Sequence, residues 1–314
     1  MVHAPLLVRG MLCITLVGIA GPAGRAAEEP TKPPHLRQLT HTVHAYGCFS
    51  PDGKRIVFQS NATGRWQLYT IGVDSAGLAP LFRSEGNDIT PVYSPEGDRI
   101  LFVSERDGNR EVYVCDADGS NQRNLSNHGS MDIHPMWSAD GARIIFSSNR
   151  GKDDPDDYDI YEMNADGSGV RQITSGPEID TYASWSPDGT RIVTRRVIDE
   201  KRNNEVFVMN ADGTGAFNLT NAPGDYDGWP VWSPDGAWIC YAGGGPDHGN
   251  RSLFLIRPDG SQRTRLTSPW AGDHCYDTQP SFSRDGTKIV FTRYRPRSSH
   301  ESAELVVMVV PKLG

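Results

Sequence analysis

From about residue 36 to its end, the chain alternates short apolar runs with polar turns. Runs such as Arg-Ile-Val-Phe at 55–58 and Arg-Ile-Ile-Phe at 143–146 are rich in β-branched and aromatic residues. Such runs, bounded by Gly, Pro, Asp and Ser, are typical of β-strands. In four copies a third apolar run leads through an Asp-Gly turn into a short fourth run. Because an Asp-Gly turn is a strong hairpin signal, the pattern predicts four-stranded antiparallel units.

One turn of the form Ser-x-Asp/Glu-Gly recurs six times and sets the period of the chain. Its serines stand 44, 44, 48, 47 and 50 residues apart, which is the length of one four-stranded propeller blade. An aromatic residue precedes the serine in every copy. We therefore expect an all-β fold, a six-bladed β-propeller. The six turns begin at Ser50, Ser94, Ser138, Ser186, Ser233 and Ser283.

The two ends of the repeat region complete one another. The sixth unit stops after its third strand, whereas an extra fourth strand, Gln-Leu-Thr at 38–40, precedes the first unit. We expect residues near 36–40 to pair beside residues 304–310 and so close the ring, because closure removes the open sheet edges that promote aggregation. The predicted propeller domain spans residues 36–314.

The N-terminal region has the features of a secretory signal peptide. A charged start, an apolar run at 11–20 and small residues before position 28 predict a signal peptide at 1–27 and a short linker at 28–35. An uncleaved membrane anchor is the alternative, although the apolar run is short for a membrane span. No second long apolar stretch follows. We expect a periplasmic or secreted monomer without stable membrane insertion after cleavage.

Charge and cysteine usage exclude two other classes of protein. The net charge of −8 and the absence of a basic run argue against a nucleic-acid partner. Four cysteines after the signal peptide are too few for a disulfide scaffold. Cys115 and Cys240 fall in apolar strands and are expected to be buried. Cys48 and Cys275 lie near equivalent positions of neighbouring blades, where a bridge could form but is not favoured.

The repeat resembles the TolB-type β-propeller repeat. The resemblance rests on four successive patterns: Asp-x-x-Pro-x-Trp-Ser, Arg-Ile-x-Phe, Ile-Tyr-x-Met-Asn-Ala-Asp-Gly and Leu-Thr. It is closest over 132–174 and 180–220, and it covers the predicted mature chain. The resemblance implies a periplasmic scaffold that binds envelope proteins without catalysis. TolB also has an N-terminal α/β domain for which we find no room here. Similar blades occur in prolyl-oligopeptidase-type enzymes and in oligogalacturonate lyases, whose metal sites are rich in histidine.

One position in each repeat could carry binding chemistry. Six residues before each turn serine stands an aspartate or, once, a histidine at the start of the predicted innermost strand. Sixfold geometry predicts that these side chains encircle one mouth of the central channel, where they could bind a divalent cation or a cationic side chain of a partner. The alternative is a structural role, since Asp often accepts hydrogen bonds at strand ends. We call this set the channel-mouth ring: His44, Asp88, Asp132, Asp180, Asp227 and Asp277.

The loops between the second and third strands vary in length and charge, and variable loops are common binding elements. The segments 149–158, 195–205, 243–246 and 293–304 are expected on the face of the ring. His44, His134 and His274 are weak candidates for a metal site. No signature of a catalytic class is present, and no cofactor is predicted.

The sequence therefore favours a non-catalytic, protein-binding scaffold of the cell envelope. Two alternatives stay open. One is a metal-dependent polysaccharide lyase or hydrolase using the histidines, and the other is a propeller that binds a small ligand or a metal at the channel mouth.

Overall fold

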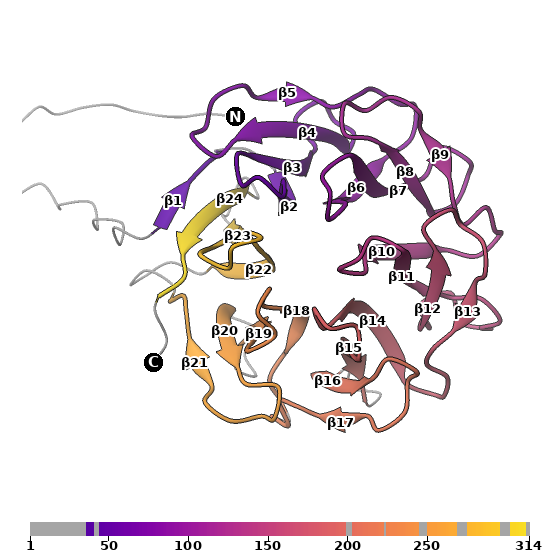
Figure 1. Cartoon of the computed structure of the whole chain (residues 1–314), viewed down its shortest axis with the longest axis vertical. Helices are drawn as coiled ribbons and strands as arrows, with labels where there is room; N and C mark the ends of the chain where they lie inside the picture. The colour runs from indigo at the N-terminus through magenta and orange to yellow at the C-terminus, as the bar shows by residue number, and fades with distance from the viewer. Residues whose placement is uncertain are drawn as a thin grey trace, which may run out of the picture. The chain divides into compact units, whose positions relative to one another are not determined.

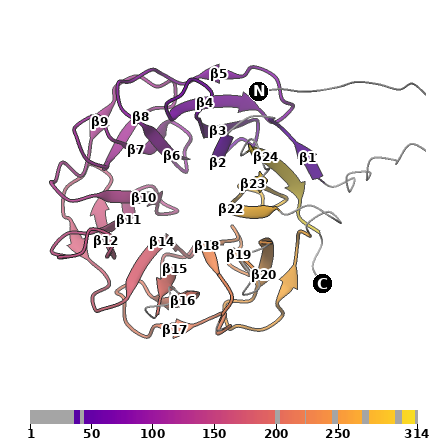
Figure 2. The ribbon, with the colours of Figure 1, turned by 180° about the vertical axis from the view of Figure 1, so that it is seen from behind.

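Six four-stranded antiparallel sheets surround a central axis as the blades of a propeller (Figure 1). The computed structural model describes residues 36–40, 44–198, 203–222, 224–244, 250–268, 275–295 and 302–311. Viewed from behind, the same six blades follow one another around the axis (Figure 2). The predicted fold class is confirmed.

Each blade has its strands in chain order from the axis outward, apart from the last blade, whose outer strand comes from the N-terminal end of the propeller. The innermost strands are β2 (His44–Phe49), β6 (Asp88–Tyr93), β10 (Asp132–Trp137), β14 (Ile179–Trp185), β18 (Gly228–Trp232) and β22 (Tyr276–Phe282). The second strands are β3 (Arg55–Ser60), β7 (Arg99–Ser104), β11 (Arg143–Ser148), β15 (Arg191–Val197), β19 (Ile239–Gly243) and β23 (Lys288–Arg295).

Third and fourth strands complete the blades. The third strands are β4 (Gln67–Gly72), β8 (Glu111–Asp116), β12 (Asp159–Asn164), β16 (Asn204–Asn210), β20 (Ser252–Ile256) and β24 (Ser302–Val309). The outer strands are only two or three residues long, and they are β5 (Ala79–Pro80), β9 (Arg123–Asn124), β13 (Arg171–Gln172), β17 (Phe217–Asn218), β21 (Thr264–Arg265) and β1 (Leu36–Gln38).

The repeated turn is a hydrogen-bonded device that joins the first two strands of a blade. In the first blade, the Ser50 hydroxyl donates to the Asp52 carboxylate at 2.6 Å and accepts from the backbone N–H of Arg55 at 3.0 Å. Gly53 completes the turn with φ of 68°, a conformation that glycine adopts without steric cost. The structural role predicted for these turns is confirmed.

The core lies between neighbouring blades. Trp137 of the third blade packs in one cluster with Leu101 and Val112 of the second blade, and Trp185 and Trp232 form the same kind of interblade contact. On the other side, the guanidinium of Arg99 lies 4.8 Å from the centre of the Trp137 ring. The predicted role of these aromatic residues in packing between blades is confirmed.

Closure of the ring follows the prediction. Strand β1 pairs antiparallel with β24, with Leu36 opposite Met308 and Gln38 opposite Val306. The Thr40 hydroxyl then accepts from the backbone N–H of Leu305 at 3.1 Å. Thr174 and Thr220 make the equivalent bond in their own blades, which explains the recurring Leu-Thr pair.

Deleting residues 28–42 is expected to abolish cooperative folding, because it removes β1 and leaves β24 as an unpaired edge. Size-exclusion chromatography and thermal unfolding measure the effect, and deletion of residues 28–34 alone, which keeps β1, serves as the control. A monodisperse, cooperatively melting 28–42 deletion would contradict the closure argument.

The cysteines, the loops and the N-terminal segment can also be compared with the expectations from the sequence. No disulfide joins Cys48 to Cys275, and Cys115 and Cys240 are buried. The predicted loop at 149–158 is confirmed, because β11 ends at Ser148 and β12 begins at Asp159. The predicted loops at 195–205 and 293–304 are shorter than expected, because β15 continues through Val197 and β23 through Arg295. The predicted signal peptide and linker lie outside the described residues. Within the described residues, no helix has the length and apolar character to cross a membrane.

Candidate binding site at the central channel

The channel-mouth ring lies where predicted along the chain, at the start of each innermost strand, but its side chains are buried. The exposed fraction is 5% for His44 and at most 1% for the five aspartates. In four blades the aspartate forms an ion pair with an arginine of the same blade. The pairs are Asp88 with Arg106, Asp132 with Arg150, Asp180 with Arg196 and Asp277 with Arg293. These contacts give the ring a structural role, and a binding role stays a prediction.

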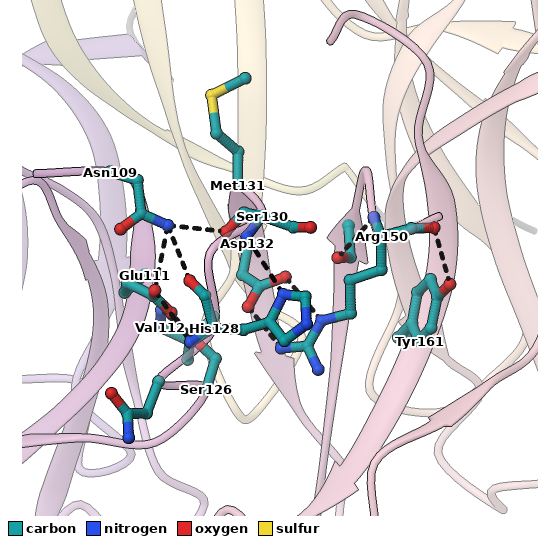
Figure 3. A network of polar contacts seen from close by, with 12 residues as sticks. Asn109, Glu111, Val112, Ser126, His128, Ser130, Met131, Asp132, Arg150 and Tyr161 are labelled. Atoms are coloured by element: carbon teal, nitrogen blue, oxygen red, sulfur yellow. Dashed lines mark hydrogen bonds and ion pairs between the residues drawn. The ribbon is translucent and has the colours of Figure 1, made fainter. Parts of the chain in front are cut away.

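Most of these ion pairs have two-point geometry. Asp180 accepts from Nε and Nη2 of Arg196 at 2.8 and 2.7 Å. Asp132 and Arg150 face one another in the same way, with Arg150 also fixed through its carbonyl, which accepts from the Tyr161 hydroxyl at 3.2 Å (Figure 3). Bidentate pairs of this kind are among the stronger polar contacts in proteins.

Blade five breaks the pattern. Asp227 is fully buried, yet among the described residues neither of its carboxylate oxygens has a partner within hydrogen-bonding distance. Gly243 stands where the fourth and sixth blades carry their arginine. Burial raises the pKa of Asp227 to about 7, against an opposing effect of the Arg263 charge. Burial thus favours the protonated form of this carboxyl group.

A second ring, which the sequence did not reveal, lines the channel itself. Two residues beyond each ring position, the innermost strand contains a β-bulge whose residue has φ between +50° and +58°. Non-glycine residues seldom adopt this conformation, and such strain often marks functional positions. The six bulge residues line a cavity of about 270 Å³ along the axis, and they are Tyr46, Thr90, His134, Tyr182, Trp229 and Gln279.

Aromatic rings of this set crowd together on the side of blades three to five. His134 stacks on Tyr182 with ring centres 3.7 Å apart, and Tyr182 lies 5.6 Å from Trp229. The Tyr46 and Tyr182 hydroxyls are 3.3 Å apart across the channel. These contacts fill this side of the channel with flat side chains.

Next to these rings is a pocket of about 470 Å³, which we call the arginine basin. It opens on the face where the innermost strands begin, since it is bounded by the starts of β10 and β14, the end of β15 and the residues preceding β18 and β20. Its lining is Ile133, His134, Asp156, Tyr158, Ile179, Thr181, Arg195, Val197, Asn204, Tyr226 and Arg251.

Tyr226 organises the two arginines of the basin. Its hydroxyl accepts from Nη1 of Arg195 at 3.1 Å, and the guanidinium of Arg251 lies 3.7 Å from the centre of its ring. A backbone bridge to Asn204 holds Tyr226 in place. The backbone of Arg251 is held from both sides, because its N–H donates to Cys275 and its carbonyl accepts from Asp277.

The charge of these arginines is not balanced by a neighbouring acid. Within the described residues, neither Arg195 nor Arg251 forms an ion pair, and the Nε of each is buried without a hydrogen-bond partner. Burial lowers the pKa of Arg251 and the Arg195 charge adds to this decrease, while the nearby tyrosines oppose it. Both side chains are half-buried, so two neighbouring like charges are only partly screened by solvent, and an anionic ligand would offset their repulsion.

The candidate metal ligands are not brought together. His44 stands in the first blade against Phe58, and His134 stands in the third blade against Tyr182. Burial lowers the pKa of His44 to about 4, and burial followed by the charges of Arg195 and Arg110 lowers the pKa of His134. His274 lies outside the described residues. Among the residues described, no three His, Cys, Asp or Glu side chains are grouped to hold a metal.

Comparison with known proteins supports the repeat assignment. Residues 36–154 match the family model described as TolB beta propeller domain. The putative TolB from Agrobacterium tumefaciens is 19% identical, with 86% of this chain and 91% of that chain covered at a TM-score of 0.65. TolB from Acinetobacter baumannii is 16% identical, with coverages of 86% and 64% and a TM-score of 0.62.

Similar folds also occur among enzymes. An oligogalacturonate lyase in complex with manganese is 15% identical, with 88% of this chain and 93% of that chain covered at a TM-score of 0.61. No curated protein matches the chain. Identities this low establish the fold and leave the activity open. Residues 36–154 of this chain therefore match the TolB-type β-propeller repeat, and the solved structures share its fold.

Proposed function

We propose that this chain is an exported, non-catalytic binding module of the periplasm or cell envelope, which holds an envelope protein on the face that carries the arginine basin. The observation that supports this proposal most strongly is the unpaired arginine cluster in an acidic chain of net charge −8. Positive charge gathered at one pocket of an otherwise negative protein steers and orients an acidic partner.

Two further observations support binding over catalysis. The basin lies where the repeat departs from its own pattern, which is where function is expected in a repeat protein. The scaffold role is also the one that the resemblance to TolB implies. A metal-dependent lyase is the chief alternative, but the described histidines and carboxylates do not form a group of metal ligands.

A capture experiment tests the proposal. The mature protein is immobilised and exposed to periplasmic and envelope extract, beside the double variant Arg195→Gln/Arg251→Gln and the control Arg123→Gln. Arg123 is an exposed arginine of the outer strand β9, and its side chain donates a hydrogen bond to the Asp166 carbonyl. We expect one envelope protein retained in stoichiometric amount by the wild type and the control, and at least about tenfold less by the double variant. Equal retention by all three proteins, or no retained protein, would refute the proposal.

A further inference from the structure

We infer that Arg195 and Arg251 form a carboxylate-binding site, in which the two guanidinium groups hold one carboxylate of the ligand above the aromatic side of the channel. This inference deepens the proposed function, because it names the group of the partner that the basin recognises.

The first argument is the hydrogen-bonding capacity that each guanidinium leaves unused among the described residues. Arg195 uses Nη1 for Tyr226 and leaves its buried Nε without a partner, and the Nε of Arg251 is likewise unpaired. Elsewhere in the chain the Nε and Nη2 edge is the one that binds carboxylates, as in Arg196 with Asp180 and Arg293 with Asp277. The basin thus brings together two guanidinium groups, the group that this protein uses to bind its own aspartates, neither of which has a carboxylate partner among the described residues.

The second argument is that Arg195 is an exception to the repeat. It pairs with Thr181 across the first two strands of its blade. The equivalent positions of the other blades hold uncharged residues, and they are Gln59, Val103, Ser147, Ala242 and Thr292. Blade folding therefore does not require an arginine here, whereas a ligand-binding site would.

The third argument is that the site is already assembled. Tyr226 contacts both guanidinium groups, and backbone bonds fix both Tyr226 and Arg251. A prearranged site avoids the entropic cost of ordering two long side chains on binding. Asp156 is the carboxylate in the lining and it is exposed, so an incoming carboxylate meets net positive charge at the two arginines.

The surroundings of the arginines describe the rest of the ligand. Trp229 lies 5.6 Å from the Arg251 guanidinium, and the Tyr182 ring lies 4.9 Å from that of Arg195. Flat apolar surfaces beside the two cations suit the carbon chain or ring that carries the carboxylate. We therefore assign the site to a carboxylate on a partly apolar carrier, either an acidic segment of a protein or a free organic acid.

Isothermal titration calorimetry at constant ionic strength tests this assignment with three probes: glutarate, a peptide of four glutamates and inorganic phosphate. The proteins are the mature wild type, Arg251→Gln, Arg195→Lys and the control Arg123→Gln. Arg251→Gln is the main variant because the described structure records no hydrogen bond from the Arg251 guanidinium, so its loss should not unfold the blade. Thermal unfolding of each variant verifies this.

We expect glutarate or the peptide to bind the wild type and the control equally. Arg251→Gln should weaken binding at least tenfold, and Arg195→Lys should weaken it several-fold because lysine keeps the charge but loses the two-point geometry. Binding by glutarate indicates a free acid as sufficient ligand, and binding by the peptide alone indicates an acidic protein segment. Phosphate binding as tight as glutarate, or unchanged binding by Arg251→Gln, would overturn the assignment.

The outcome separates this inference from the proposed function. If the captured envelope protein depends on the arginines but none of the probes binds, the carboxylate assignment fails and the binding module stands. If a probe binds at the arginines while no envelope protein is captured, the site is confirmed and the scaffold proposal fails.

Discussion

Replacing Asp277 by Asn is expected to lower the free energy of unfolding by about 3–5 kcal/mol, the usual cost of removing one member of a buried ion pair. The Arg293 side chain is 2% exposed and Asp277 is fully buried, and their two hydrogen bonds are both 2.7 Å long. Although burial acts against the charge of Arg293, the Asp277 carboxylate raises its pKa. The amide would leave this cation buried beside a neutral group.

Urea unfolding at pH 8 measures the change. Asp153→Asn is the matched control, because Asp153 is exposed and the same substitution there should alter stability by less than about 0.5 kcal/mol. The double variant Asp277→Leu/Arg293→Met, which replaces the pair by apolar side chains, should recover most of the loss. Equal stability of the Asp277 and Asp153 variants would show that the ion pair adds nothing to folding.

The architecture could be predicted because its determinants are local. The turn at Ser50 and its five copies depend on residues within five positions of each other, so each copy is readable without knowledge of the fold. The apolar runs give the strands, and their period gives the number of blades. Ring closure could be predicted by counting strands, because the sixth repeat unit lacked a fourth strand and an extra strand at 38–40 preceded the first unit.

The chemistry of the channel-mouth ring could be predicted only in part. The position of Asp132 at the start of its strand is a local property. Its partner Arg150 lies beyond the end of β11, whereas Asp180 pairs with Arg196 inside β15. Because the partner arginine shifts along the chain from blade to blade, the sequence suggested open carboxylates where the fold places buried ion pairs.

The arginine basin could not be predicted from the sequence, because its residues are distant from one another along the chain. His134, Arg195 and Arg251 come from three blades, and no spacing rule connects them. Tyr226 looks like an ordinary loop residue until the fold sets it between two arginines. The one available signal was Arg195, a charged residue at a strand position that is uncharged in the other blades. The expected loop at 195–205 included Arg195, although the structure places it in β15.

Replacing Asp227 by Asn is expected to stabilise the protein strongly at pH 8, less than half as much at pH 5, and hardly at all below pH 4. Burial raises the pKa of Asp227 to about 7, above its usual value near 3.8, so the folded protein binds an extra proton between these two values. Its contribution to stability is then fully present below about pH 4 and is lost as the pH rises to about 7. A shift of this size corresponds to about 4 kcal/mol, and its main cause is burial, which disfavours the ionised form.

Asparagine resembles the protonated carboxyl group at every pH, so it should remove this dependence. We expect Asp227→Asn to melt roughly 5–10 °C above the wild type at pH 8, less than half as far above it at pH 5, and within about 1 °C of it below pH 4. The comparison is made as a difference between the two proteins, because carboxylates with lowered pKa values, such as Asp188 and Asp285 at about 2, contribute the opposite trend to both. A difference that does not change with pH would show that Asp227 is ionised in the fold. A loss of stability at pH 8 would mean that the Asp227 carboxylate has a stabilising partner. Blade five would then lack the arginine of the other blades, but its carboxylate charge would still be compensated.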